Sequence, residues 1–209
     1  MVTSNVSKAP SGDRRVRRTH AALQRALIEL VDHQDLPRIS VADVAERAEV
    51  SRSTFYDHYR DVHELAEAAC TAMIDDMVAS LPSPGQRFSG PQPGPIEALQ
   101  DFFAHFAEHA NLYRSVLGPQ GSARIIDHIR RLTTAAIYLG THQADSCDHV
   151  TLAASDIPQD VTAAFAAAGF VGVAIDWLQR GCPHAPAEMA TRTLPLFTAL
   201  YGEEMLPPS

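Results

Sequence analysis

ISVADVAERAEVSRSTFYDHYRDVHEL, residues 39–65, predicts two short helices joined by a tight turn and followed directly by a third. The first helix has apolar residues at the spacing of one helix face: Val41, Val44, Ala45 and Ala48. Ser40 precedes this stripe, where a side-chain oxygen caps free backbone N–H groups. Residues 49–51 are a tight connection with Val50 as an apolar plug, so the pattern indicates a helix-turn-helix.

The second helix is expected at residues 52–59, with Ser51 as its N-cap. Phe55 and Tyr59 are one turn apart and should point into the core. The opposite face is short, polar and rich in hydrogen-bond donors: Ser53, Thr54, Tyr56 and Asp57. A recognition helix in the DNA major groove needs a face of this kind.

This segment resembles the DNA-binding domain of the tetracycline-repressor (TetR) family over residues 18–69. The similarity lies in the run Val50–Tyr56, then His58 and Tyr59, then Glu64 and Leu65, after an apolar preceding helix. The resemblance implies an all-α protein, with an N-terminal three-helix helix-turn-helix domain joined to a larger helical ligand-binding and dimerisation domain. It also implies a ligand-responsive regulator, expected to be a repressor, that binds a palindromic operator as a homodimer.

Two positions depart from the family pattern. The turn position that usually holds glycine is Glu49, which is strained if its φ is positive. The position after Asp61 that usually holds a phosphate-binding lysine is Val62. One contact with the DNA backbone is therefore expected to be missing, with more of the affinity carried by the N-terminal arm.

The expected DNA contacts fall into two groups. Base edges would be reached by four residues: Arg52, Ser53, Thr54 and Asp57. Phosphates would be held by residues around the turn and by the arginines of the arm: Ser40, Ser51, Tyr56, His58, Arg14, Arg17 and Arg18. Contact between Arg52 and a guanine is the strongest single expectation for base specificity.

The charge distribution supports contact with DNA at one end only. The net charge is −8, which argues against nonspecific coating of nucleic acid. Residues 1–25 nevertheless carry six cations against one anion, whereas residues 61–209 carry seven arginines against 17 acidic residues. A solvated basic tail is the alternative interpretation, but the adjacent helix-turn-helix favours phosphate binding.

Three regions are expected along the 209 residues. Residues 1–13 are predicted to be a disordered basic arm, 14–60 the DNA-binding domain, and 61–209 the effector-binding and dimerisation domain. Beyond the helix-turn-helix, helices are expected at 14–33, 62–81, 96–110, 122–142, 159–180 and 186–201, with a short helix or turn at 111–117. Proline, glycine and polar residues predict loops at 82–95 and 143–158.

The helix at 159–180 is rich in alanine and glycine and apolar nearly all round, so it must be buried on more than one side. Its apolar run Val161–Ile175 is short for a bilayer, so a buried helix is preferred to a membrane span. In the TetR family the last two long helices form a four-helix bundle between subunits. That resemblance implies a dimer interface at Gly169, Gly172, Met189, Phe197 and Leu200.

The apolar side chains of the C-terminal region have two interpretations, plain core or an effector pocket. The family resemblance adds the pocket, for an apolar or amphipathic ligand. Its expected lining is Phe102, Phe103, Phe106, Tyr113, Leu117, Ile125, His128, Ile129, Phe165 and Phe170.

No catalytic motif or cofactor site is recognised. His105 and His109 have a metal-compatible spacing, as does the loop cluster at 142–149, but neither has the order of a known metal motif. Cys70, Cys147 and Cys182 are expected to be free thiols in the cytoplasm, and no signal peptide is recognised. We therefore expect no enzyme activity, no metal, no cofactor and no membrane partner.

Two alternatives to the ligand-responsive repressor stay open. One is a DNA-binding regulator without a small-molecule effector, constitutive or controlled by a protein partner. The other is a small helical metalloenzyme that uses the histidines and cysteines as ligands.

Overall fold

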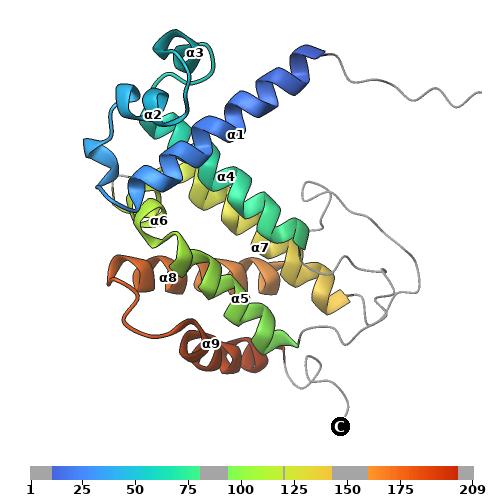
Figure 1. Cartoon of the computed structure of the whole chain (residues 1–209). Helices are drawn as coiled ribbons and strands as arrows, with labels where there is room; N and C mark the ends of the chain where they lie inside the picture. Colours follow the sequence, from blue (N-terminus) through green and yellow to red (C-terminus); the bar gives the residue numbers. More distant parts are fainter. Residues whose placement is uncertain (1–10, 81–93, 120, 143–159, 202–209) are drawn as a thin grey trace, which may run out of the picture. The chain divides into compact units, whose positions relative to one another are not determined.

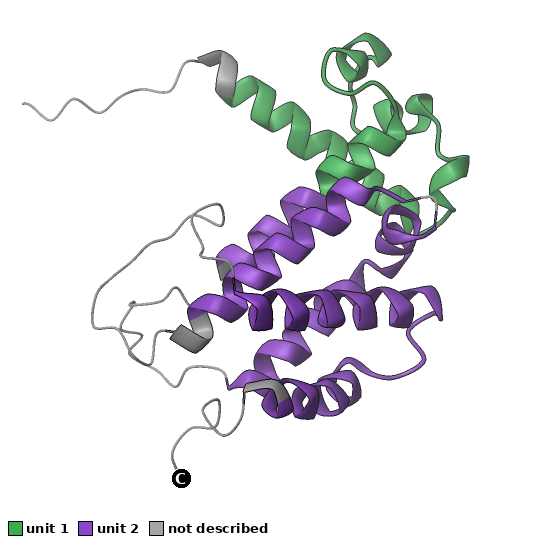
Figure 2. Cartoon of the chain, turned by 180° about the vertical axis from the view of Figure 1, so that it is seen from behind, with its two compact units in different colours: residues 1–69 green, residues 70–209 purple. Residues whose placement is uncertain are grey.

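The computed structural model describes residues 11–80, 94–119, 121–142 and 160–201, and these are helical with no β-strand among them (Figure 1). The protein is all-α, as predicted. The chain divides into two compact units, Met1–Ala69 and Cys70–Ser209 (Figure 2). The division falls inside α4 (Val62–Ser80), so one continuous helix contributes to both units.

Unit 1 contains α1 (Ser11–Val31), a 3-10 turn η1 (Leu36–Arg38), α2 (Val41–Arg47), α3 (Arg52–Tyr56) and the start of α4. The helices meet in a core whose main side chains are fully buried: Leu23, Leu27, Val44, Phe55 and Leu65. Helix α1 begins earlier than the predicted Arg14, so residues 11–13 of the expected disordered arm are helical. The rest of that arm lies outside the described residues.

Local hydrogen bonds define the helix-turn-helix. The Ser40 hydroxyl accepts from the Asp43 N–H at 3.2 Å, and the Asp43 carboxylate accepts from the Ser40 N–H at 2.8 Å, which forms a reciprocal capping box. Ser51 caps α3 by accepting from the Thr54 N–H at 3.0 Å. The expected caps are therefore present.

Helix α3 is shorter than the predicted range of 52–59. The cause lies just beyond it, where Asp61 caps α4 by accepting from the Glu64 N–H at 2.8 Å. The Glu64 carboxylate in turn accepts from the Arg60 N–H at 2.6 Å. This second capping arrangement turns the chain away from the axis of α3.

Glu49 has a φ of 56°, so the condition for strain at this turn position is met. The left-handed conformation brings the Cβ of a non-glycine residue close to the backbone.

We expect Glu49→Gly to raise the free energy of unfolding by about 0.5–1 kcal/mol, since glycine relieves this strain but loses more backbone entropy on folding. Urea denaturation would measure it. Glu46→Gly is the matched control: it replaces an exposed glutamate inside α2 and should destabilise by about 1 kcal/mol. Equal destabilisation by both substitutions would contradict the strain at Glu49.

Unit 2 contains the rest of α4 with α5 (Pro95–Glu108), α6 (Ala110–Leu117), α7 (Ala123–His142), α8 (Val161–Gln179) and α9 (Pro186–Tyr201). Helix α5 packs along α9, and α8 packs against α5, α6, α7 and α9, which makes α8 the central helix of this unit (Figure 1). The predicted loop at 143–158 lies outside the described residues. So does most of the loop at 82–95, although α5 begins at its last residue, Pro95.

Helix α8 is the one described helix long and apolar enough to cross a membrane by length and composition. The core helix of a soluble protein satisfies the same test, and α8 has a fully or nearly buried face in this unit. That face consists of Ala163, Ala166, Ala167, Phe170, Val171, Ala174, Trp177 and Leu178.

Candidate DNA-binding surface and helical groove

The outward face of α3 is exposed and polar, as the sequence predicted. Arg52, Ser53 and Asp57 are exposed, and Thr54 is half-buried. Arg52 has no ion-pair or hydrogen-bond partner among the described residues, so its guanidinium is available for an external acceptor. Phe55 on the opposite side is 0% exposed and anchors the helix in the core.

The hydroxyl groups on this face are linked through Ser51. Its Oγ lies 2.7 Å from the Ser53 Oγ and 2.8 Å from the Thr54 Oγ1, besides capping α3. Ser40 is similarly engaged, because its hydroxyl donates to the Asp43 carboxylate at 2.8 Å. Both serines that were expected to bind phosphate therefore orient the helix starts in this structure.

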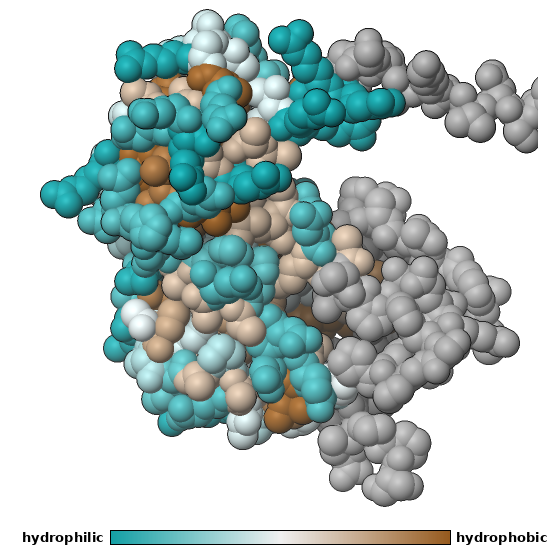
Figure 3. Space-filling view, viewed as in Figure 1, coloured by the Kyte–Doolittle hydropathy of each residue, from teal (hydrophilic) through white to brown (hydrophobic). Residues whose placement is uncertain are grey.

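Other expected phosphate-binding side chains are open to solvent. Tyr56 is 60% exposed, and the arginines at positions 14, 17 and 18 lie exposed on α1. The N-terminal part of α1 forms a strongly hydrophilic block on the surface (Figure 3). Val62, by contrast, is only 9% exposed and belongs to the core of unit 1.

A pair of histidines lies beside the recognition helix and was not predicted. The Nε2 of His20 on α1 is 3.2 Å from the Nδ1 of His58, and their rings make an edge contact. Burial, followed by the nearby charge of His58, lowers the pKa of His20. No sequence signal joins these residues, because they are 38 positions apart.

A second histidine with a lowered pKa lies in unit 2. The Nε2 of His105 is 2.8 Å from the hydroxyl of Tyr113, which is 0% exposed. Burial is the main cause of the lowered pKa of His105, with His109 contributing. Burial also raises the pKa of the Tyr113 hydroxyl, so this tyrosine stays protonated at neutral pH.

These lowered pKa values predict loss of stability on acidification. His20 and His105 bind a proton more readily in the unfolded chain, so between their folded pKa and 6.5 the free energy of unfolding falls as pH falls. Asp43, Asp61, Asp127 and Asp176 have lowered pKa values, and their contribution to stability is lost only near and below pH 4. We therefore expect a lower Tm at pH 5.5 than at pH 7.5. The double variant His20→Gln/His105→Gln should show a smaller difference, and an unchanged difference would contradict this assignment.

The expected effector-pocket aromatics are brought together by α5, α6 and α8, but they pack on one another. Ring centroids are 4.3 Å apart for Phe102 and Phe170 and 4.4 Å apart for Phe106 and Tyr113. Phe103 contacts Phe170 and Trp177, and it is 0% exposed. Leu117, Ile125 and Ile129 are also buried.

Two expected members of the pocket lie elsewhere. Phe165 is 66% exposed, because it is on a different face of α8 from the buried Phe170. His128 makes a 2.8 Å hydrogen bond with Asp75 near the surface of unit 2.

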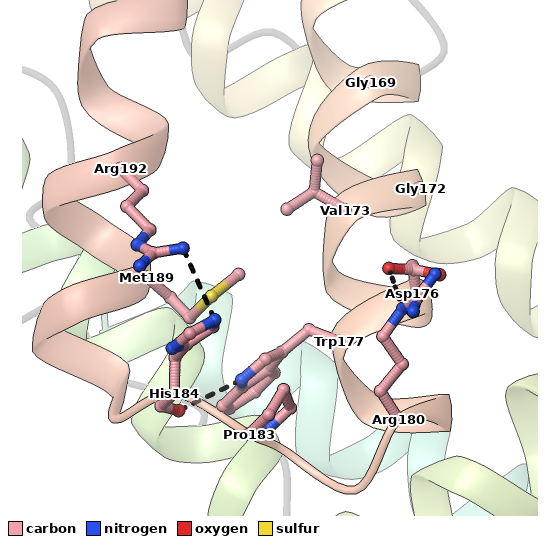
Figure 4. Close-up of a pocket in the computed structure, with 10 residues that line it drawn as sticks. All are labelled: Gly169, Gly172, Val173, Asp176, Trp177, Arg180, Pro183, His184, Met189 and Arg192. Carbon is pink, nitrogen blue, oxygen red and sulfur yellow. Dashed lines mark hydrogen bonds and ion pairs between the residues drawn. The ribbon is translucent and has the colours of Figure 1, made fainter.

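A groove opens between α8 and α9, and none of the expected pocket residues lines it (Figure 4). It has a volume of about 580 Å³, and its floor is apolar, formed by Val173, Trp177 and Met189. The rim carries Asp176, Arg180, His184 and Arg192. Gly181 and Cys182, with φ of 80° and 56°, end α8 and lead into α9. The Trp177 indole N–H donates to the His184 carbonyl at 3.1 Å, which ties the floor to this connection.

The residues expected at a dimer interface divide between this groove and the core. Gly169, Gly172 and Met189 line the groove. Phe197 is 9% exposed and its ring contacts that of Phe170, so it is largely covered within one copy. The side chain of Leu200 lies outside the described residues.

Among the described residues, no three potential metal-binding side chains lie together. His105, one of the pair considered for a metal, is bonded to Tyr113 instead. The loop cluster at 142–149 lies outside the described side chains.

A capped helix-turn-helix with an exposed polar recognition face, followed by a separate helical unit, defines a DNA-binding transcriptional regulator rather than an enzyme. The chain belongs to the TetR family. The model of bacterial regulatory proteins of the tetR family matches residues 24–69, and the model of a transcriptional regulator C-terminal region matches residues 95–198.

A similarity to one curated protein is consistent with this family assignment. An uncharacterized HTH-type transcriptional regulator of Bacillus subtilis (strain 168), YxbF, is 39% identical over 77 residues, covering 34% of this chain. The chain spans only 20% of the length of that relative.

Solved structures share the fold across nearly the whole chain. A tetR-family regulator from Streptomyces coelicolor is 21% identical with a TM-score of 0.61, covering 90% of this chain and 85% of that one. The dihydroxyacetone kinase operon activator DhaS is 15% identical with a TM-score of 0.63, covering 88% and 96%. FadR from Bacillus subtilis, solved with stearoyl-CoA, is 13% identical with a TM-score of 0.52, covering 90% and 98%.

Proposed function

We propose that this regulator is a cytoplasmic repressor that binds a palindromic operator as a homodimer and is released by a small apolar or amphipathic effector. The exposed face of α3 is the observation that carries DNA recognition, since Arg52 has no partner among the described residues and Phe55 anchors the helix behind it. One such short helix reads few bases, and two-fold symmetry places a second copy on the other half-site.

The proposed DNA contacts follow the arrangement of side chains on unit 1, referred to from here on as the DNA-binding head (residues 1–69). Base edges are read by Arg52, Ser53, Thr54 and Asp57, and phosphates are held by Tyr56, His58 and the arginines at 14, 17 and 18. Ser40 and Ser51 support these contacts by holding the starts of α2 and α3. The operator is proposed to contact the N-terminal unit, where the basic residues are concentrated, and not the acidic C-terminal region.

Selection of bound sequences from a random DNA pool, followed by gel shifts at fixed salt, tests this proposal. A two-fold symmetric consensus bound by two copies is the expected result. Enrichment of an asymmetric site bound by one copy would contradict the homodimer, and no enrichment would contradict sequence-specific binding. A reporter under the selected operator then tests repression, which matters because DhaS, similar in fold, is named as an activator.

The effector is proposed to bind among α5, α6, α7 and α8, beside Phe102, Phe103, Phe106, Tyr113, Leu117, Ile125, His128, Ile129 and Phe170. FadR, a protein of similar fold, was solved with stearoyl-CoA, which supports a ligand with an apolar chain. The ligand would have to separate packed rings, so it would act by favouring a conformation in which they part.

Regulation without an effector is the second candidate, and one observation favours it. Phe103, Phe106 and Tyr113 are at most 1% exposed. The ring of Phe106 packs against that of Tyr113, and the ring of Phe103 packs against those of Phe170 and Trp177. A thermal-shift screen with fatty acids and acyl-coenzyme A separates the two candidates, because a ligand that binds the folded state raises Tm. A concentration-dependent rise together with release of operator DNA supports the effector. Operator binding with no response to any compound supports the constitutive form.

A further inference from the structure

One face of α8 is apolar and is not covered by the other residues that the structure describes. Val161 is 75% exposed and Phe165 is 66% exposed, and Gly169 and Gly172 continue the same face at helical spacing. A Cβ placed on either glycine would meet nothing within 4 Å, so another backbone can approach closely there. Exposed apolar faces of this kind mark interaction surfaces.

The groove between α8 and α9 continues from this face, because the two glycines belong to both. Its floor is buried and apolar, with Trp177 2% exposed and Met189 7% exposed (Figure 4). Whatever covers the exposed face of α8 therefore also covers the groove.

The charges at the rim of the groove are already paired. Arg180 lies 2.7 Å from the Asp176 carboxylate, and Arg192 lies 2.7 Å from the Glu188 carboxylate. Figure 4 shows the first of these pairs at one side of the groove and the His184–Arg192 contact at the other. A rim neutralised in this way favours an apolar occupant over an anion, because an anion would have to compete with these carboxylates.

The same helix carries both a protruding aromatic side chain and a groove, which is what a two-fold interface requires. Two copies of α8 related by a perpendicular two-fold axis run antiparallel, and they approach most closely at Gly169 and Gly172. Measured along the helix axis of α8, Phe165 then lies about 8 Å from the crossing point on one side, and Asp176 lies about 8 Å from it on the other side. Each Phe165 is thus placed opposite the groove of the other copy.

We propose that Phe165 of each copy inserts into the α8–α9 groove of the other, over Val173, Trp177 and Met189. This inference rests on the proposed homodimer and assigns to Phe165 the role of its main apolar anchor. Burial of a phenylalanine against a tryptophan and a methionine is typical of the residues that dominate an interface.

Dimer dissociation measures the contribution of Phe165. We expect Phe165→Ala in the full-length protein to raise the dimer Kd at least about 100-fold, since the contact is lost twice. Tyr56→Ala is the matched control, because Tyr56 is 60% exposed but lies on the DNA-binding head. It should leave the Kd unchanged in sedimentation experiments. An unchanged Kd for Phe165→Ala would overturn the inference.

Paired cysteines test the geometry directly, in a Cys147→Ser/Cys182→Ser background that keeps the buried Cys70. In Phe165→Cys/Asp176→Cys the two thiols of one chain are about 16 Å apart along α8, too far for an internal disulfide. Because Phe165→Cys also removes the phenylalanine ring, oxidation with copper phenanthroline is carried out at a protein concentration above the dimer Kd measured for Phe165→Ala. Under this condition it should link two chains. Neither single variant should cross-link. The same position in the two copies lies about 8 Å from the crossing on opposite sides, so the two identical thiols are about 16 Å apart along the helix axis. Phe165→Cys/Ala136→Cys, with an exposed alanine of α7, is the matched negative control.

The outcomes separate this inference from the proposed function. Cross-linking of the Phe165→Cys/Asp176→Cys variant alone, with a weakened Phe165→Ala dimer, supports the insertion. A dimeric wild type whose double-cysteine variant is also dimeric but forms no cross-link overturns the insertion and leaves the homodimer intact. A wild type that stays monomeric while bound to its operator overturns both.

Discussion

Replacement of Phe55 by alanine is expected to abolish DNA binding by unfolding the N-terminal unit. The Phe55 side chain is 0% exposed and lies between the recognition face and the core, with ring contacts to Tyr56 and Tyr59. Loss of a buried phenylalanine costs about 3–5 kcal/mol. Domains are stable by only about 5–15 kcal/mol, and this unit is small. Gel shifts with the selected operator and denaturation followed by circular dichroism would measure both effects.

The neighbouring residue provides the control. Tyr56 is 60% exposed, so Tyr56→Ala should change the free energy of unfolding by no more than about 0.5 kcal/mol. It should still weaken operator binding, because Tyr56 is proposed to hold a phosphate. Equal destabilisation by the two substitutions, or operator binding by Phe55→Ala at the wild-type affinity, would contradict the packing described for α3.

Replacement of Arg52 by alanine is expected to reduce sequence preference by about 1–3 kcal/mol, which is roughly 5- to 150-fold in the ratio of operator to random-DNA affinity. The physical reason is the loss of a bidentate contact with a base edge from an exposed guanidinium at the start of α3. Competition gel shifts with operator and random DNA at one salt concentration give this ratio. Equal loss of affinity for both DNAs would show that Arg52 binds the backbone instead.

Two further variants separate charge from readout. Arg52→Lys keeps the charge without the fork geometry, so it should lose most of the preference while retaining affinity for random DNA. Arg17→Ala on α1 should weaken binding to all sequences alike and reduce the slope of log K against log salt by about one. A change in preferred sequence for Arg17→Ala would contradict its assignment to the backbone.

The helix-turn-helix could be predicted because its determinants are local. Ser40 and Ser51 cap helices through bonds to residues three positions ahead, and the positive φ of Glu49 follows from its place in the turn. Each of these features involves residues within one helical turn. Their spacing in the chain was therefore sufficient to place the recognition face.

For the C-terminal unit, the helices could be predicted from the sequence, but not which of their side chains are covered. Phe165 and Phe170 lie five positions apart on one apolar helix, yet one is 66% exposed and the other 6% exposed. Hydrophobicity alone did not distinguish them, since α8 is apolar on nearly every side. The neighbours α5, α6, α7 and α9, distant in the chain, decide which face of α8 is covered.

The all-helical class, the helix-turn-helix and the residues on its outer face could thus be predicted from the chain, because caps, turns and helical spacing act within a few residues. The pairing of His20 with His58, the packing of the aromatic rings and the groove between α8 and α9 became evident only with the helices packed together. These features depend on side chains from separate helices meeting in space, and no spacing within one segment encodes that meeting.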